Sequence, residues 1–536
     1  MNTKLFALIL IVFISAGAYG QTPTPTPTPS PVPIAEKPGQ TLTDLQSKIR
    51  ARLLRPELRR GQVGVKIVSL NSGKFVFEEN AEKYFMPASN MKNFTVSAAI
   101  EKLTPDFRFV TSVYAPAAPD SNGAVRSLRI FGRGDVSIST AFFPLDDSDK
   151  DPATGATDPN KVYYKGIDRL VEKIVAAGVK RVDGDLIADE TYFTGNPLPG
   201  SWEVDDLQWY YGAEISALPL NDNAIDLSVK PGPVGYPCSV RVAPFNPVVR
   251  VVNRCTTAAA GSVRTLRIEK KLDRNIYEIS GSLPAGNNGF SGSITISRPA
   301  ELFAALLKER LALKGVVVTG QARAVNDRPP GGQESSIEIA KLESPPLSLI
   351  AAKTMKPSQN MYTETLLWTL GEQSRASAVV PGGGVVTPST ADSAELGRSA
   401  VKRFLTEIGV APDGIIQHDG SGLSRHNLIT PAAVVQLYSY MGKQSKFSQA
   451  WRDSLTIGGV DGTLRRRFVG TRASGNVRGK TGTIDQVSAL SGYMRTAAGE
   501  ELVFSMVVNG VNEPGVRTAA MDEIVVMLAN FDGRID

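Results

Sequence analysis

The tetrapeptide Lys480-Thr481-Gly482-Thr483 lies in the C-terminal part of this 536-residue chain, just before a predicted β-hairpin. At average residue usage, Lys-Thr-Gly is expected on the order of 0.1 times by chance in a chain of this length, and it occurs once. Residues 488–496 and 501–510 have the strand patterns of a hairpin around a turn at 497–499. The tetrapeptide is therefore placed on a strand that leads into an antiparallel sheet.

A second hairpin is predicted near the other end of the chain. Residues 61–70 alternate as a strand, Asn71-Ser72-Gly73 form a turn, and residues 74–79 return as the second strand. A helix is expected close to the C-terminus, over residues 515–529. Because hairpins and helices bracket the chain, we expect one antiparallel sheet built from both ends and flanked by helices, an α/β (α+β) fold.

Two shorter motifs precede the Lys-Thr-Gly segment, Ser89-Asn90-Met91-Lys92 and then Ser358-Gln359-Asn360. Each pattern, Ser-x-x-Lys and Ser-x-Asn, is expected roughly once or twice by chance. Other matches occur at Ser399 with Lys402, Ser69 with Asn71, and Ser474 with Asn476. These fail on position, because they lie in a predicted surface helix over 392–403, in the first hairpin turn, and too close to the Lys-Thr-Gly segment. The order of the three motifs predicts an acyl-serine active site.

Ser89 is predicted to open a helix, because apolar side chains recur at helical spacing from Met91 to Leu103. Residues three apart share one helical face, so Lys92 can reach the Ser89 hydroxyl. A helix N-terminus also offers free N–H groups and a partial positive charge to an oxyanion. The alternative is that Ser89 only caps the helix, which would leave the other two motifs unexplained.

A serine nucleophile needs a base at neutral pH. The chain contains only His418 and His426 and has no Gly-x-Ser-x-Gly segment, so a Ser-His-Asp hydrolase is disfavoured. The scarcity of histidine also argues against zinc, and no metal or other cofactor is expected. Lys92 remains as the base. Burial beside Ser89, away from carboxylates, would lower the pKa of Lys92 and leave free amine to accept a proton.

The N-terminal segment predicts export. Residues 1–20 combine Lys4, an apolar run and small residues, which is typical of a secretory signal peptide. Residues 21–33 form a Thr/Pro-rich linker that favours polyproline II. In an exported chain, Cys238 and Cys255 are interpreted as one local structural disulfide.

Composition narrows the class of partner. The formal charge of +6 is modest for this length and is not gathered in one large patch, so nucleic acid is a poor partner. A basic surface would suit an anionic cell-wall polymer or peripheral contact with a membrane, although an ordinary solvated surface is the simpler explanation.

About 500 residues remain after the signal and linker, too many for one hydrophobic core.

The chain resembles the class C low-molecular-mass penicillin-binding proteins, which are D-alanyl-D-alanine carboxypeptidase/endopeptidases. Besides the three motifs, the resemblance rests on Gly184–Asp189, the stretch Ser201–Asn223, Asp419–Arg425 and Gly458–Leu464. It implies a penicillin-binding protein/β-lactamase-like transpeptidase domain, an antiparallel sheet flanked by helices. From the residues alone, structural and functional roles are equally favoured for Asp419–Arg425 and for Gly458–Leu464.

The long separation of Ser89 from Ser358 implies a large strand-rich insertion that forms one or two extra domains, as in this family. We place the insertion at 106–288 and the peptidase domain at 34–105 and 289–536. The insertion favours a peptidase of this class over a β-lactamase, because compact relatives of this fold place the motifs closer together.

The resemblance implies roles for the motif residues. Ser89 is the nucleophile, Lys92 its base, and Ser358 relays a proton to the leaving amine. Asn360 orients Lys92 and the substrate amide, and Lys480 supplies positive charge. Thr481 and Thr483 hold the substrate carboxylate with their hydroxyls, and the N–H groups of Ser89 and Thr483 form the oxyanion hole. Gly482 is expected because a side chain there would block substrate lying along the strand.

The function implied is that of a periplasmic serine D-Ala-D-Ala carboxypeptidase with DD-endopeptidase activity. Its substrates would be peptidoglycan pentapeptides and cross-linked muropeptides, and β-lactam antibiotics such as penicillin would inhibit it. The sequence leaves the balance between the two activities open. Two alternatives stay open as well: a serine β-lactamase or esterase of the same fold, and a non-catalytic peptidoglycan-binding protein.

Overall fold

The computed structural model describes residues 39–143, 145–146, 149–150, 155, 158–271, 274–327, 336–377 and 390–535. The predicted signal peptide (1–20) and linker (21–33) lie outside the described residues. Within these ranges, no helix has the combined length and apolar character that crossing a membrane requires.

The main sheet has six strands, each antiparallel to its neighbours, in the order β2-β1-β24-β23-β22-β21. Their bounds are β1 (Gln62–Ser69), β2 (Phe75–Glu79), β21 (Thr456–Ile457), β22 (Arg478–Ile484), β23 (Val487–Arg495) and β24 (Glu501–Asn509). Both predicted hairpins are present, and Gln62 of β1 pairs with Asn509 of β24. The sheet is therefore built from both ends of the chain, as the sequence predicts.

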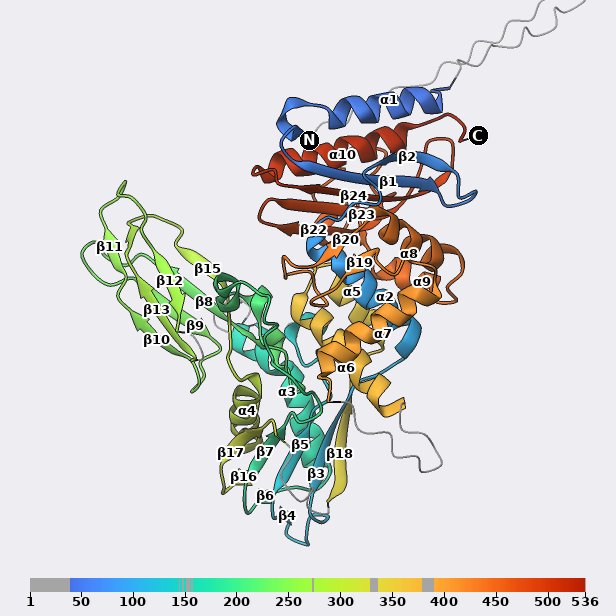
Figure 1. The fold of residues 1–536 in the computed structure, drawn as a ribbon. Coiled ribbons are helices and arrows are strands. Elements are labelled where there is room, and N and C mark those ends of the chain that lie inside the picture. The colour runs from blue at the N-terminus through green and yellow to red at the C-terminus, as the bar shows by residue number, and fades with distance from the viewer. Residues whose placement is uncertain are drawn as a thin grey trace, which may run out of the picture. The chain divides into compact units, whose positions relative to one another are not determined.

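Helices cover both faces of this sheet (Figure 1). Helices α1 (Leu42–Leu53) and α10 (Pro514–Asn530) pack on one face, and α2 (Lys92–Leu103) and α8 (Pro431–Lys443) on the other. Side chains of β24 alternate between the two cores: Phe504 and Met506 join the first, Val503 and Val507 the second. Each fully buried side chain of this kind contributes about 1.5–3 kcal/mol, so the two-sided burial holds the central strands rigidly.

More helices surround α2 on the second face. They are α5 (Leu347–Met355), α6 (Asn360–Ser377), α7 (Ser393–Glu407) and α9 (Ser448–Ser454), with the short strands β19 (Ile415–Ile416) and β20 (Leu428–Ile429) paired nearby. The predicted surface helix over 392–403 is α7, whose N-cap Asp392 accepts a hydrogen bond from the Glu395 N–H at 2.7 Å. Ser399 is exposed on this helix, which confirms that its Ser-x-x-Lys match is a surface feature.

The insertion is strand-rich, as predicted. A five-stranded mixed sheet contains β3 (Val110–Ala115), β5 (Leu128–Phe131), β7 (Leu186–Asp189), β17 (Ala322–Val325) and β18 (Ile337–Glu343), together with α3 (Pro159–Ala176) and α4 (Pro299–Leu313). Smaller sheets are formed by β4 (Ala124–Val125), β6 (Arg181–Val182) and β16 (Val317–Val318), and by β8 (Ala224–Lys230), β9 (Ser239–Ala243) and β15 (Phe290–Thr295). Others are formed by β10 (Arg250–Asn253), β12 (Arg267–Lys270) and β13 (Ile276–Ser280), and by β11 (Thr256–Ala258) and β14 (Ser282–Pro284).

Residues beyond the predicted end of the insertion, residue 288, pack with the strands of the insertion. Strand β18 pairs with β3, and Phe303 and Leu342 share a hydrophobic core with Val113. The segment that enters the insertion and the segment that leaves it lie side by side, since the Ser344 N–H donates a hydrogen bond to Phe109 O at 2.9 Å. The pairing of β18 with β3 could not be read from the sequence, because it joins segments more than two hundred residues apart.

Cys238 and Cys255 lie in the insertion and are joined by a disulfide with an S–S distance of 2.08 Å. Both residues are buried in the core of the insertion. The bond therefore ties together two segments of the strand-rich region, as the sequence predicts, at a place separate from the three motifs.

Candidate active site

Ser89 lies in a single 3₁₀ turn, Ala88–Met91, that leads directly into α2. The predicted helix is present, with this tighter turn at its start. Lys92 is the first residue of α2, and its Nζ donates a hydrogen bond to Ser89 Oγ at 3.0 Å. The half-buried serine hydroxyl and the lysine amine are thus in direct contact, as their spacing predicts.

The Lys92 side chain is fully buried and makes three hydrogen bonds. Besides Ser89, its Nζ donates to Asn360 Oδ1 at 2.5 Å and to the backbone carbonyl of Ser421 at 2.7 Å. Burial lowers the pKa of Lys92 from 10.5 to about 7, while the charges of Asp419 and Glu364 act in the opposite direction. The expectation that Lys92 lies away from carboxylates is therefore wrong, although desolvation still dominates.

The two carboxylates organise the loop that contains Ser421. Glu364 of α6 accepts hydrogen bonds from the N–H groups of Gly420 at 2.9 Å and Ser421 at 2.7 Å. Burial, followed by repulsion from Asp419, raises the pKa of Glu364 above its ordinary value. A carboxylate thus binds the backbone N–H of Ser421, the residue whose carbonyl group accepts a hydrogen bond from Lys92.

Asp419 accepts four hydrogen bonds from neutral donors. They come from the N–H groups of Gly422 and Ser424, the amide of Asn427 and the indole of Trp202, at 2.7–2.9 Å. The Asp419–Arg425 segment therefore has a structural role that bears directly on Lys92. The sequence analysis missed Glu364 altogether, since no motif marks it, and identified Asp419 only as part of a family segment.

The second motif faces the third. Lys480 Nζ donates to Ser358 Oγ at 2.8 Å and to the carbonyl of Thr481 at 2.8 Å. Lys480 is fully buried, and burial, followed by the positive charge of Lys92, lowers its pKa well below the ordinary value. Ser358 has a left-handed φ of 68° just before α6 begins at Asn360. The Asn360 amide donates to the carbonyl of Tyr211 at 2.8 Å.

Strand β22 presents the Lys-Thr-Gly segment. Thr481 is nearly buried and its hydroxyl donates to the hydroxyl of Thr463 at 2.7 Å, while Thr483 is exposed. Thr463 belongs to the Gly458–Leu464 segment, whose role the sequence left undecided. Its hydroxyl lies beside the motif on an exposed residue, which makes it a further candidate for substrate contact.

Gly482 has no room for a side chain on the side that faces the Ser89 turn. A Cβ atom at this position would lie 2.5 Å from Pro87 O and 3.1 Å from Ser89 N. A contact shorter than 3.0 Å with a backbone atom cannot be relieved by a side-chain movement. The absence of a side chain therefore lets β22 pack closely on the turn that carries Ser89.

A buried polar network joins the same turn to the sheet. Asn90 donates to Lys480 O at 3.0 Å and accepts from the hydroxyl of Ser491 at 2.6 Å. Asn93 donates to Ser491 Oγ at 3.0 Å and accepts from the hydroxyl of Tyr438 at 2.9 Å. The sequence analysis missed these residues. The sequence feature that could have identified them is the pair of asparagines, Asn90 and Asn93, at the start of a helix otherwise rich in apolar residues.

The structure thus brings all three motifs into one site. Ser89, Lys92 and Asn360 form one hydrogen-bonded set, and Lys480 and Ser358 form another. A lysine with a pKa near 7 holds a substantial fraction of free amine at neutral pH, so Lys92 can accept the hydroxyl proton of Ser89.

Comparison with known proteins shows the family of the chain. Residues 45–531 match the D-Ala-D-Ala carboxypeptidase 3 (S13) family. The chain is 34% identical over 511 residues to a D-alanyl-D-alanine carboxypeptidase of Actinomadura sp. (strain R39), covering 93% of this chain and 87% of that protein. It is 26% identical to D-alanyl-D-alanine carboxypeptidase DacB of Haemophilus influenzae, covering 84% of this chain and 85% of that protein.

The fold is shared with a solved structure as well. Penicillin binding protein 4 (dacB) from Haemophilus influenzae matches with a TM-score of 0.72 at 22% identity, covering 91% of this chain and 98% of that chain. This match confirms the predicted fold class, a penicillin-binding protein-like domain with extra strand-rich regions. The chain belongs to the D-Ala-D-Ala carboxypeptidase 3 (S13) family and is a serine-type peptidase.

Proposed function

We propose that this protein is a D-Ala-D-Ala carboxypeptidase, with DD-endopeptidase activity, that acts on peptidoglycan stem peptides through an acyl-enzyme at Ser89. The observation that carries the proposal is the 3.0 Å hydrogen bond between Ser89 Oγ and the buried Lys92 amine. A serine hydroxyl becomes an effective nucleophile only when such a base lies within hydrogen-bond reach.

The reaction proceeds in two acyl-transfer steps. Ser89 Oγ attacks the carbonyl carbon between the two D-alanine residues, and Lys92 takes the hydroxyl proton. The proton passes through Ser358, which is hydrogen-bonded to Lys480, to the leaving amine as the C–N bond breaks. Water then attacks the ester carbonyl, a proton returns to Ser89, and the shortened peptide leaves. In the endopeptidase reaction the leaving amine belongs to the cross-linked stem peptide.

Charge and hydrogen-bond donors on β22 favour a substrate with a free C-terminal carboxylate. Lys480 supplies positive potential, and the hydroxyls of Thr481 and Thr483 bind the carboxylate oxygens. The backbone N–H groups of Ser89 and Thr483 stabilise the oxyanion, and each such donor contributes about 3 kcal/mol in acyl-transfer enzymes. The close packing of Gly482 against Pro87 supports this role, since it brings these two backbone segments together.

A β-lactam would acylate the same serine. Its strained amide presents a carbonyl carbon and a nearby carboxylate, the two features that the site recognises. Penicillin binding protein 4 of Haemophilus influenzae has been crystallised in complex with a β-lactam, and the shared fold supports penicillin binding here. The signal-like residues 1–20 support export to the periplasm, where peptidoglycan is accessible.

The first experiment is intact-mass analysis after incubation with benzylpenicillin. We expect one persistent adduct on the wild-type protein and none on Ser89→Ala. The control is Ser399→Ala, which alters the exposed Ser-x-x-Lys match on α7 and should be acylated like wild type. Absence of an adduct without loss of penicillin would favour a binding protein, whereas loss of penicillin without an adduct would indicate a β-lactamase.

The second experiment tests the substrate class. Cleavage of the terminal peptide bond is measured by mass spectrometry, as conversion of the pentapeptide to the tetrapeptide, for a stem pentapeptide that ends in D-Ala-D-Ala and for the same peptide with a C-terminal carboxamide, whose leaving group is D-alaninamide. We expect the carboxylate peptide to be cleaved and the carboxamide to react much more slowly, because Lys480 and the two threonines lose an anionic partner. Equal rates would contradict carboxylate recognition. Cleavage of a cross-linked muropeptide dimer measures the endopeptidase activity.

A further inference from the structure

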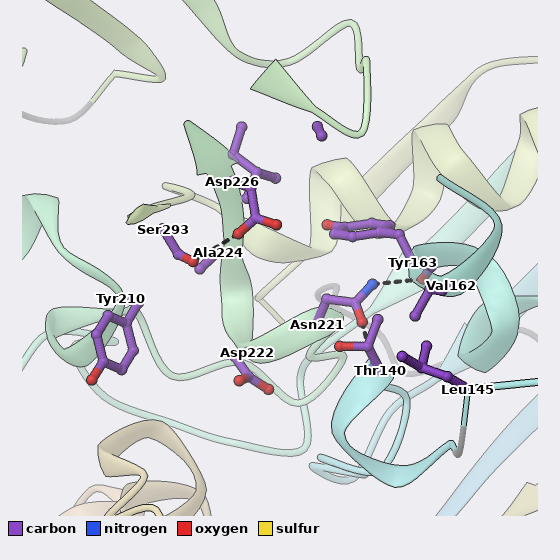
Figure 2. Close-up of a pocket in the computed structure, with 12 residues that line it drawn as sticks. Thr140, Leu145, Val162, Tyr163, Tyr210, Asn221, Asp222, Ala224, Asp226 and Ser293 are labelled. Carbon is purple, nitrogen blue, oxygen red and sulfur yellow. Dashed lines mark hydrogen bonds between the residues drawn. The ribbon is translucent and has the colours of Figure 1, made fainter. Parts of the chain in front are cut away.

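A short segment of the insertion, Asn221-Asp222-Asn223, lies directly against the Ser358-Gln359-Asn360 motif. The φ angles of its three residues are all positive, at 44°, 62° and 54°. Such backbone persists only where the surroundings hold it firmly. The Asn221 amide supplies part of this support, because it donates to Tyr163 O at 2.7 Å and accepts from the Thr140 N–H at 2.8 Å (Figure 2).

The Asn223 side chain holds the other end of the segment. Its amide donates to Glu214 O at 2.8 Å, and its oxygen accepts from the Leu220 N–H at 3.1 Å. The two asparagines therefore fix the backbone on both sides of Asp222. The carboxylate of Asp222 is presented in one defined position.

That carboxylate accepts hydrogen bonds from residues on both sides of Asn360. Its Oδ2 accepts from Gln359 Nε2 at 3.0 Å, and its Oδ1 accepts from the Tyr362 hydroxyl at 2.5 Å and the Ser139 hydroxyl at 2.9 Å. All three donors are neutral, and within the ranges that the structure describes no lysine or arginine forms an ion pair with Asp222. A half-buried carboxylate held in this way is acting as a fixed acceptor.

The bond to Gln359 lies next to strained backbone. Ser358 has a φ of 68°, a region that non-glycine residues rarely occupy. The Gln359 N–H donates to Thr354 O at 2.9 Å, and its side-chain oxygen accepts from the Met361 N–H at 3.2 Å. The remaining polar group of the Gln359 side chain is the amide nitrogen, which Asp222 holds. The left-handed turn at Ser358 is thus held in place by Asp222, a residue of the insertion.

We propose that Asp222 is a positioning residue that sets the geometry of the Ser358-Gln359-Asn360 motif, so that Asn360 meets Lys92 and Ser358 meets Lys480. The inference rests on the proposed acyl-serine function and adds a role for the insertion in it. Asp222 acts through Gln359 and Tyr362, and it need not touch the substrate.

The geometry predicts that asparagine is a poor substitute. In Asp222→Asn, the single side-chain oxygen can accept from the Tyr362 and Ser139 hydroxyls, which places the new amide nitrogen opposite Gln359 Nε2. Two donors then face each other and the Gln359 bond is lost, whereas the flipped amide keeps that bond and turns its nitrogen toward the two hydroxyls. Either orientation loses part of the three-bond arrangement that Asp222 makes. A second change, Gln359→Glu, restores the bond with reversed polarity. In the Asp222→Asn/Gln359→Glu double variant, the carboxylate introduced at position 359 accepts from the amide introduced at position 222.

A matched control is available on the neighbouring strand. Asp226 of β8 is exposed and accepts from the Ser293 hydroxyl at 2.8 Å (Figure 2). Asp222 and Asp226 line the same pocket of about 300 Å³. Asp226→Asn therefore makes the same chemical change in the same pocket without affecting Gln359.

The rate of adduct formation with benzylpenicillin is measured by mass spectrometry over a range of concentrations. The limiting rate reports the acylation step, and the final adduct fraction counts correctly folded molecules. We expect Asp222→Asn and Gln359→Glu each to lower the limiting rate about tenfold, with the half-saturating concentration nearly unchanged. The double variant should be faster than either single variant, and Asp226→Asn should match wild type. A wild-type rate for Asp222→Asn, or a double variant slower than both singles, would overturn the proposal.

Amide hydrogen exchange provides a readout that does not need acylation. Peptides that cover residues 354–362 should exchange faster in Asp222→Asn than in wild type, and Asp226→Asn should leave them unchanged. If the wild-type protein forms no adduct, the proposed function fails, while exchange still decides the positioning role. Unchanged exchange in Asp222→Asn would overturn that role whatever the acylation result.

Discussion

Lys92 Nζ donates to the backbone carbonyl of Ser421 at 2.7 Å, across 329 positions of the chain. This bond and the bond to Asn360 hold the amine beside Ser89 in a single orientation. Glu364 in turn holds the Ser421 N–H. The amine of Lys92, the proposed base, is therefore positioned from two distant segments of the chain.

The acylation rate should depend on pH through Lys92. Its pKa is lowered to about 7 by burial, and the base works only as free amine. We expect the acylation rate constant to rise about tenfold per pH unit below about 7 and to level off above it. Measuring benzylpenicillin acylation between about pH 5.5 and 9, with thermal midpoints at each pH as a control, checks this. A rate that is flat across this range would contradict lysine as the base.

Replacing Glu364 by glutamine should move this pH profile. The charge of Glu364 raises the pKa of Lys92 against the effect of burial, so its removal should shift the midpoint to lower pH. One backbone bond to the Gly420–Ser421 loop is lost as well, and the plateau rate should fall. The midpoint of the profile is independent of that fall, and a midpoint at or above the wild-type value would exclude the electrostatic role.

Gly482→Ala should disable the site. The added Cβ would lie 2.5 Å from Pro87 O, so β22 and the Ser89 turn must move apart. Overpacking of this kind typically costs about 1–3 kcal/mol of stability, and we expect acylation to fall by roughly tenfold or more. Thermal melting and adduct formation measure the two effects. Gly515→Ala is the matched control, because a Cβ there meets no atom within 4 Å.

The disulfide should stabilise the insertion without contributing to catalysis. Cys238 and Cys255 are 17 positions apart and lie away from the three motifs. Replacing both by serine should lower the free energy of unfolding by about 2–4 kcal/mol. The benzylpenicillin adduct should still form at Ser89 at room temperature. Loss of acylation in a variant that remains folded would show that the disulfide also supports the active site.

The local features of the fold could be predicted from the sequence. Alternation over 61–79 and 488–510 produces the two hairpins, and helical spacing after Ser89 produces α2. The contact between Ser89 and Lys92 follows from one helical turn. The pairing of β18 with β3 could not be predicted, because it joins segments that lie far apart in the sequence.

The sequence by itself determined which polar groups are present and in what order: a serine with a lysine three positions on, then a serine and an asparagine, then a second lysine. The burial and the hydrogen-bond partners of these groups were decided by tertiary packing alone. The Ser421 carbonyl is a backbone group that no motif marks, and Glu364 and Asp222 become relevant only because distant segments pack on α6. Side-chain identity and the spacing of apolar residues can be read from the sequence, whereas desolvation and hydrogen-bond partners depend on which segments pack together in the tertiary structure.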